Sequence, residues 1–267
     1  MNGILRLEEQ RHVALWGEER WLASVHPAGP SVVASGPFAG RTLAEGCPGF
    51  PVLGKVIEAR TRLSVQVHPN ERTAKTVGGD PKTEMWCMLG EGDIYAGLKP
   101  GFVAEDVARA VSDGSFGRIL AAHHGADGDV FFIPGGLVHA IGDDTRVFEV
   151  QQSSDTTYRL YDWNRVGADG RPRELHVEKG LAAIDFSLEP PVARRSVECP
   201  FFDFRKERVV GRRTFAAFGG YTVVYAANGA AEICGEPLAE GSCALALPGV
   251  AFELSSSAGA TVFVVRA

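Results

Sequence analysis

The chain has 267 residues, of which 45% are hydrophobic and 22% charged, and its formal net charge is −6. This length allows one large domain or two small ones, and the negative charge disfavours general binding to nucleic acid or to an anionic membrane surface. No stretch is long and apolar enough to span a bilayer.

The cysteines and the N-terminus indicate a cytoplasmic protein. The five cysteines are an odd number and include no Cys-x-x-Cys, which is typical of reduced thiols and not of a disulfide framework or a thiolate zinc site. The opening MNGILRLEEQRH lacks the apolar core of a signal peptide.

Most of the chain predicts short strands separated by Gly and Pro, in the spacing of a β-sandwich or barrel. Apolar residues at helical spacing predict helices over 103–112 and 177–184, and a short helix around 117–123 is also expected. Clear strand patterns cover 63–68, 84–89, 130–134, 146–151, 222–225 and 261–265.

The segment around 190–195 reads as a boundary between a domain over 1–192 and a C-terminal β lobe over 193–267. Two segments, 128–135 and 241–249, share a strand followed by Pro-Gly and hint at a degenerate repeat. Residues 177–267 contain no histidine, so we expect an imidazole-based metal site in the first half alone.

Four side chains from three separated segments form a candidate metal site. Residues i and i+2 of a strand face the same side, so Gln66 points with His68, and Lys82 points with Glu84. A Pro-Gly-Gly turn at 134–136 is expected to direct His139 back toward the sheet. This oxygen and nitrogen set suits one Zn²⁺ per chain with an open position, and the site would keep a net positive charge.

Each of these residues also has an ordinary structural interpretation. His68 alone could be a satisfied strand histidine, and Glu84 alone a surface carboxylate. The metal site is favoured because the segments occur together, whereas the adjacent pair His123 and His124 is expected in a solvated turn.

Four segments together resemble a known enzyme family. They are 50–70 (FPVLGKVIEARTRLSVQVHPN), 82–86 (KTEMW), 131–142 (FFIPGGLVHAIG) and 151–165 (QQSSDTTYRLYDWNR), and they resemble the compact bacterial form of type I mannose-6-phosphate isomerases. The resemblance covers about residues 45–185. It implies a mainly β cupin (jelly-roll) barrel with the metal site, a few short helices and a smaller, degenerate cupin-like C-terminal lobe without metal ligands.

The resemblance also implies roles for individual residues. It makes Gln66, His68, Glu84 and His139 the zinc ligands, Arg159 the catalytic arginine and Lys82 the active-site lysine. Arg165 matches a basic position just past Arg159. The sequence has no Walker-type phosphate loop, and we expect Arg165 and Lys99 to contact the substrate phosphate.

The expected reaction is the interconversion of mannose 6-phosphate and fructose 6-phosphate through a cis-enediolate, in a monomer or homodimer whose partner is a small sugar phosphate. The alternatives are a non-catalytic sugar-phosphate-binding cupin and an isomerase of another sugar phosphate. An iron dioxygenase is a further rival, against which Gln66, Lys82 and Arg159 argue. The residues leave open which group removes the C2 proton.

Overall fold

The computed structural model describes residues 3–167 and 169–267, which form two compact units. Of these residues, the first unit contains 3–12, 20–55 and 195–267, and the second contains 13–19, 56–167 and 169–194. The expected boundary at 192/193 has a counterpart at 194/195, but much of the N-terminal segment groups with the C-terminal residues. The domain assignment itself stays a prediction.

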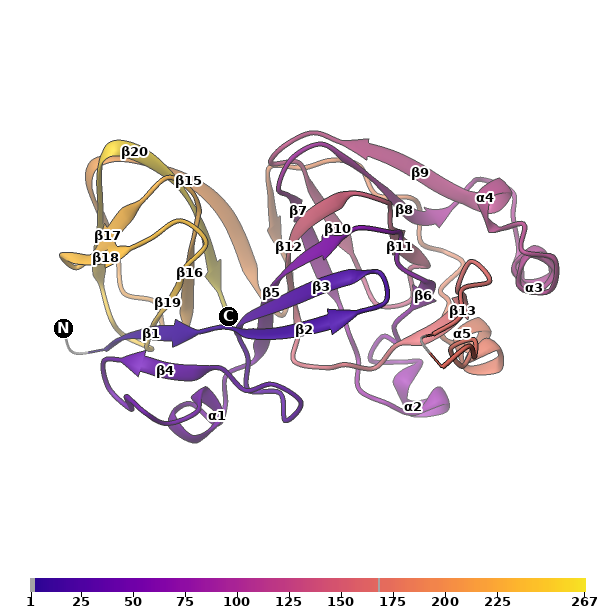
Figure 1. Ribbon diagram of the computed structural model, residues 1–267, viewed down its shortest axis with the longest axis horizontal. Coiled ribbons are helices and arrows are strands. Elements are labelled where there is room, and N and C mark those ends of the chain that lie inside the picture. The colour runs from indigo at the N-terminus through magenta and orange to yellow at the C-terminus, as the bar shows by residue number, and fades with distance from the viewer. Residues whose placement is uncertain (1–2, 168) are drawn as a thin grey trace. The chain divides into compact units, whose positions relative to one another are not determined.

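The first unit is built on a nine-stranded sheet, which explains why the N-terminal residues belong to it. The N-terminal strand forms antiparallel pairs with a C-terminal strand, with Ile4 opposite Ala246 and Leu7 opposite Cys243. In sheet order the strands are β14 (Ser196–Glu198), β15 (Asp203–Phe215), β20 (Phe252–Arg266), β16 (Thr222–Asn228), β19 (Cys243–Ala246), β1 (Ile4–Glu8) and β4 (Val32–Ser35), and the hairpin of β17 (Ala231–Ile233) and β18 (Glu236–Leu238) pairs with β20 (Figure 1).

The short helix α1 (Leu43–Gly46) belongs to the same unit and begins with a capping box, in which Thr42 and Glu45 bond each other's backbone N–H. The expected strands at 222–225 and 261–265 lie within β16 and β20, and β20 is much longer than the short strands that the sequence indicated.

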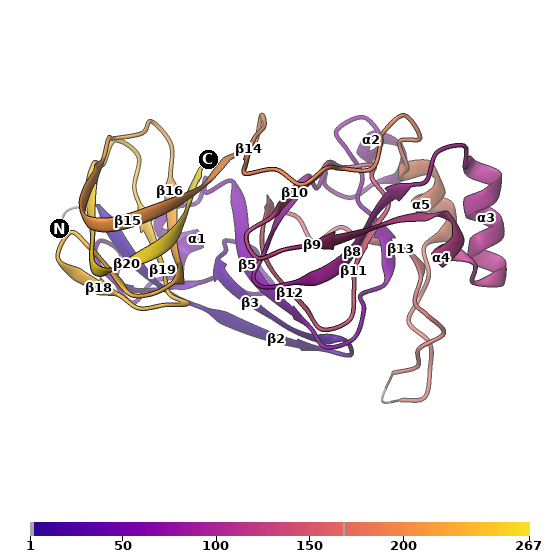
Figure 2. The same cartoon turned by 90° about the horizontal axis from the view of Figure 1, so that it is seen from above.

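Two further sheets include residues of the second unit (Figure 2). One has the order β10 (Val130–Ile133), β7 (Glu84–Met88), β12 (Thr145–Gln152), β5 (Val52–Ala59), β3 (Gly17–Ala23) and β2 (Gln10–Ala14), and its last three strands have residues in both units. The other has the order β13 (Tyr158–Tyr161), β6 (Val65–Val67), β11 (His139–Ile141), β8 (Gly92–Leu98) and β9 (Leu120–Gly125).

The sheet that contains β6 and β11 is covered on both faces. On one face, Val65, Val67, Val138 and Ala140 pack in a cluster with residues of α3 (Ala104–Asp113), α4 (Phe116–Ile119) and α5 (Val177–Ala183). On the other face, Ile141 shares a core with Trp86 and Phe131 of the opposing sheet. The remaining helix, α2 (Ala74–Val77), is a single turn.

The helices predicted at 103–112 and 177–184 are confirmed as α3 and α5, and their ends lie within one residue of the predicted ends. Their apolar residues pack against the sheet that contains β6. The short helix expected at 117–123 is wrong in its second half: α4 ends at Ile119 and β9 begins at Leu120. His123 and His124 therefore lie in a strand and not in a turn, and they pair with Ile94 and Asp93 of β8.

Candidate metal centre

Strand alternation brings one row of polar side chains to the core side of the β6 sheet. Val65 and Val67 face the helices, so Gln66 between them faces the opposing sheet. Gln66 is paired with His139 on β11 and with Arg159 on β13. Directly opposite residues of neighbouring strands share a face, so these three side chains lie side by side across three strands.

The Pro-Gly-Gly turn connects the segments that carry the predicted ligands. Gly136 donates its N–H to the carbonyl of His68 at 2.8 Å, and Gly135 donates to Thr83 Oγ1 at 3.1 Å. Gly136 has φ +97°, and a Cβ on Gly135 would lie 2.7 Å from the carbonyl oxygen of Pro69. Both glycines are needed where the turn approaches the other two segments this closely.

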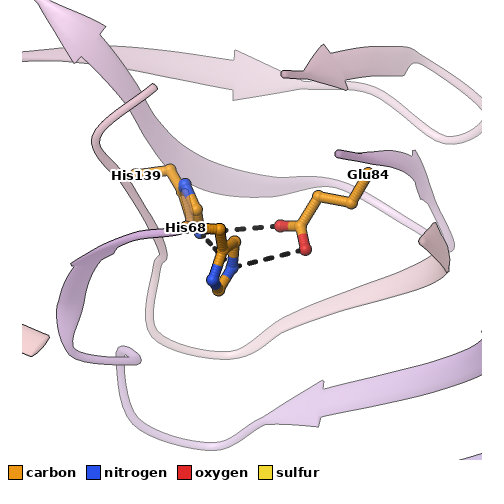
Figure 3. Close-up of side chains that lie close together, drawn as sticks. All are labelled: His68, Glu84 and His139. Atoms are coloured by element: carbon orange, nitrogen blue, oxygen red, sulfur yellow. Dashed lines mark hydrogen bonds and ion pairs between the residues drawn. The ribbon is translucent and has the colours of Figure 1, made fainter. Parts of the chain in front are cut away.

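His68, Glu84 and His139 converge in the interior of the second unit, and each is only 1% exposed (Figure 3). Their candidate ligand atoms all lie within 4.8 Å of one another. The Nε2 atoms of the two histidines are 3.2 Å apart, and each lies 3.5 Å from an oxygen of Glu84.

Backbone carbonyls orient both imidazoles. His68 Nδ1 lies 2.7 Å from the carbonyl oxygen of Thr156, and His139 Nδ1 lies 2.8 Å from that of Leu137. A carbonyl oxygen only accepts, so each Nδ1 carries the proton and each Nε2 keeps its lone pair. Burial lowers the pKa of His139 to about 4, against the opposing effect of the Leu137 carbonyl, and so favours the neutral ring.

This arrangement fits a bound cation. Two imidazole lone pairs and a carboxylate point at one buried location, and Glu84 Oε1 accepts no hydrogen bond. Lys82 Nζ lies 2.6 Å from Glu84 Oε2 and 3.0 Å from His68 Nε2, so its positive charge partly compensates the carboxylate and the lone pair. A mixed nitrogen and oxygen set with metal-facing Nε2 atoms, each oriented from its Nδ1 side, is typical of a metal centre.

Gln66 lies beside the cluster, with its Nε2 3.3 Å from His139 Nε2 and its Oε1 accepting from Ser64 Oγ at 3.2 Å. A half-turn of the amide exchanges its oxygen and nitrogen, and the Ser64 hydroxyl can accept as well as donate. Ser64 satisfies either orientation, but a turned amide would set the Gln66 oxygen against the lone pair of His139 Nε2, which a bound cation would have to compensate. The role of Gln66 as a ligand stays a prediction.

Arg159 is linked to Gln66 through Ser64 Oγ, which forms a hydrogen bond with each of them. Its Nε donates to Ser64 Oγ at 3.3 Å, and its Nη1 donates to the carbonyl of Glu174 at 2.8 Å. Burial lowers the pKa of Arg159, and the cations of Arg173 and Arg165 lower it further, while Asp162 opposes them. An arginine keeps its charge under such shifts, so a fixed positive charge stands next to Gln66.

The two predicted phosphate contacts lie in different surroundings. Arg165 binds the carboxylate of Asp162, and its Nη1 donates to the carbonyl of Arg62 at 2.6 Å. Lys99 follows β8, is exposed, and donates to the carbonyl of Arg118 at 3.0 Å. The structure gives no contact between either residue and the His68, Glu84 and His139 cluster.

Two acidic residues near the site were not predicted from the sequence. Glu149 is 2% exposed, accepts from Trp86 Nε1 at 2.8 Å and has an oxygen 3.7 Å from Lys82 Nζ. Asp162 is 5% exposed and binds two arginines. Glu149 stands within the apolar strand pattern VFEV, and a carboxylate in a strand buried on both faces is a signal that could have identified it.

No family model matches the chain, but curated relatives do. The chain is 31% identical over 273 residues to the mannose-6-phosphate isomerase of Streptococcus mutans, and the match covers 86% of each chain. It is 32% identical to the probable mannose-6-phosphate isomerase GmuF of Bacillus subtilis, over 80% of this chain and 77% of that one.

The chain belongs to the mannose-6-phosphate isomerase family.

Solved structures with a similar fold agree with this assignment. The mannose 6-phosphate isomerase from Bacillus subtilis superposes with a TM-score of 0.89 at 24% identity and covers all of both chains. A putative mannosephosphate isomerase from Archaeoglobus fulgidus gives a TM-score of 0.80 at 22% identity, over all of this chain and 98% of that one. The predicted mainly β cupin fold is thereby confirmed. In the described part of the chain, no helix has the length and apolar character to cross a membrane.

Proposed function

We propose that this chain is a zinc-dependent aldose–ketose isomerase that interconverts mannose 6-phosphate and fructose 6-phosphate through a cis-enediolate. The proposal depends on one observation: in a member of this family, His68, Glu84 and His139 are buried with their ligand atoms within 4.8 Å of one another. The cytoplasm is the proposed location, and one zinc ion per chain is the proposed loading.

We propose that His68, Glu84, His139 and the oxygen of Gln66 hold the zinc. When bound, zinc would supply a Lewis acid that polarises the substrate carbonyl. The neutral imidazoles and the single carboxylate leave such a centre with net positive charge, which favours oxygen anions in the substrate.

Arg159 supplies a second positive charge on the same side of the sheet. Its register opposite Gln66 places it one strand away from the predicted ligand, and its guanidinium is held from two sides by Ser64 and by the Glu174 carbonyl. We assign Arg159 to stabilising the negative oxygen that develops as the proton leaves C2.

Lys82 is the proposed donor to a substrate hydroxyl. The side chain is 6% exposed, and its Nζ lies 2.6 Å from Glu84 and 3.7 Å from Glu149. The carboxylates hold the ammonium at the cluster, and the donor that faces His68 Nε2 would become available to a substrate hydroxyl if a metal took that lone pair. For the phosphate we propose contacts from Arg165 and Lys99. If the alanine variants of these two residues raise KM and leave kcat unchanged, that result would support the proposal.

The decisive experiment is a coupled assay of fructose 6-phosphate against mannose 6-phosphate and glucose 6-phosphate, before and after chelation and after zinc return. We expect turnover of the mannose pair that disappears on chelation and returns with zinc. Turnover in metal-free protein would contradict the zinc mechanism, whereas turnover of the glucose pair alone would assign another isomerase. Binding of sugar phosphate without any turnover would indicate the non-catalytic alternative.

A further inference from the structure

Asp162 is a buried carboxylate that directly follows β13, the strand of Arg159. Arg173 binds it with both arms of its guanidinium, Nε to Oδ2 at 2.7 Å and Nη2 to Oδ1 at 2.6 Å. Arg165 donates to Oδ1 as well. Such forked pairing fixes the orientation as well as the distance of the partner.

Arg173 begins the short segment that holds Arg159. The carbonyl of Glu174, the next residue, accepts from Arg159 Nη1 at 2.8 Å. His176 then donates its backbone N–H to the carbonyl of Arg159 at 2.7 Å, and its Nδ1 lies 3.2 Å from the backbone N of Arg159. The position of the Arg159 guanidinium therefore depends on where residues 173–176 lie.

The negative charge of Asp162 also compensates the positive charges of the arginines around it. The cations of Arg165 and Arg173 act electrostatically on Arg159, and Asp162 is a carboxylate that binds both of them. Burial raises the pKa of Asp162, but the hydrogen bonds from Arg173 and Arg165 outweigh burial and hold its pKa below the usual range. Without this anion, the three cations would repel one another, and residues 173–176 would lose their attachment to β13.

We propose that Asp162 is a positioning residue for catalysis: through Arg173 and the carbonyl of Glu174, it fixes the guanidinium of Arg159 beside the metal centre. This inference rests on the proposed function, in which Arg159 acts on the substrate. Asp162 itself does not contact the predicted ligands in the structure.

The kinetic test is a double-mutant cycle with Asp162→Asn and Arg159→Ala, supported by metal content and circular dichroism. Asp162→Asn keeps the size of the side chain and removes its charge. We expect kcat to fall by about a hundredfold with metal content unchanged. We also expect the double variant to be no slower than Arg159→Ala alone, because both changes remove the same function. The matched control is Asp203→Asn, which breaks an Asp203–Arg205 pair of the first unit.

A readout independent of turnover is the side-chain ¹⁵Nε–H signal of Arg159, assigned by its loss in Arg159→Ala. We expect this signal to shift or broaden in Asp162→Asn and to stay in place in Asp203→Asn. An unchanged signal in Asp162→Asn, wild-type turnover in that variant, or losses that multiply in the double variant would overturn the positioning role. Should the unaltered chain lack isomerase activity, the proposed function fails, and the Arg159 signal alone decides the role of Asp162.

Discussion

The Nε2 atoms of His68 and His139 face each other at 3.2 Å in the interior of the second unit, with both Nδ1 atoms bonded to backbone carbonyls. Two lone pairs at this distance repel unless a cation lies between them or beside them. Lys82 Nζ, 3.0 Å from His68 Nε2, supplies one such charge, and a divalent metal would supply the other. The backbone bonds thus prepare the pair for a metal before it binds.

Glu84→Gln is expected to weaken zinc binding. The change keeps the shape of the side chain but removes the negative charge that the cluster offers to a cation. For the unaltered chain, zinc at a hundred times its Kd should raise the free energy of unfolding by about 2.7 kcal/mol. Urea denaturation with and without zinc should show a much smaller increase for Glu84→Gln. Glu105→Gln, on the exposed side of α3, is the control, and equal zinc stabilisation in the two variants would contradict the role of Glu84.

Arg159→Ala is expected to keep its zinc and lose most of kcat. By comparison with other fixed donors at reacting oxygens, we expect a loss of about a hundredfold to a thousandfold. Arg159→Lys should recover little, because an ammonium lacks the planar fork whose Nε and Nη1 donate separately to Ser64 and to the Glu174 carbonyl. The measurement is kcat with metal content determined on the same sample, and Arg118→Ala, an exposed change, serves as the control. Near wild-type kcat would remove Arg159 from the mechanism.

Gly136→Ala is expected to lower both stability and zinc affinity. Gly136 has φ +97°, and an added Cβ would lie 2.9 Å from Cβ of Asp185, so the turn has to move. The backbone strain alone costs about 1–2 kcal/mol. Gly101→Ala is a matched control, because Gly101 has φ +89° but an added Cβ would meet nothing within 4 Å. Thermal denaturation should show a loss in both variants, and zinc titration should show a loss in Gly136→Ala alone. Unaltered zinc affinity in Gly136→Ala would show that the turn does not set the position of His139.

The contribution of Asp162 to stability is expected to disappear in acid. Its folded pKa lies below the unfolded value of about 3.9, so its pairing stabilises the fold fully above that value and is lost as the pH falls through the folded pKa. Asp162→Asn should therefore be clearly less stable than the unaltered chain at neutral pH, with the gap narrowing below about pH 4. Urea denaturation across this pH range measures the gap. A constant difference would show that size and packing, not charge, determine the effect.

Local sequence patterns were enough to predict which side chains share a face and what chemistry they offer. Strand alternation put Gln66 with His68 and Lys82 with Glu84, and the Pro-Gly-Gly turn marked His139, because period-2 patterning and left-handed glycines are local properties. The motifs also indicated the family and its mainly β fold. Local patterns did not predict the structure of residues 117–123, because the pairing of Leu120–Gly125 with β8 overrides the helical tendency there.

How the segments meet depends on long-range strand pairing, which no local pattern predicts. The register that sets Arg159 and His139 on either side of Gln66 joins strands far apart in the chain, and no sequence period encodes such pairing. The same holds for β1, which pairs with β19 and so joins an N-terminal strand to the C-terminal strands of the first unit. It holds also for Asp162, whose partner Arg173 follows eleven residues later. Burial and long-range pairing arise only when the sheets form, and they turn ordinary carboxylates such as Glu149 and Asp162 into parts of a site.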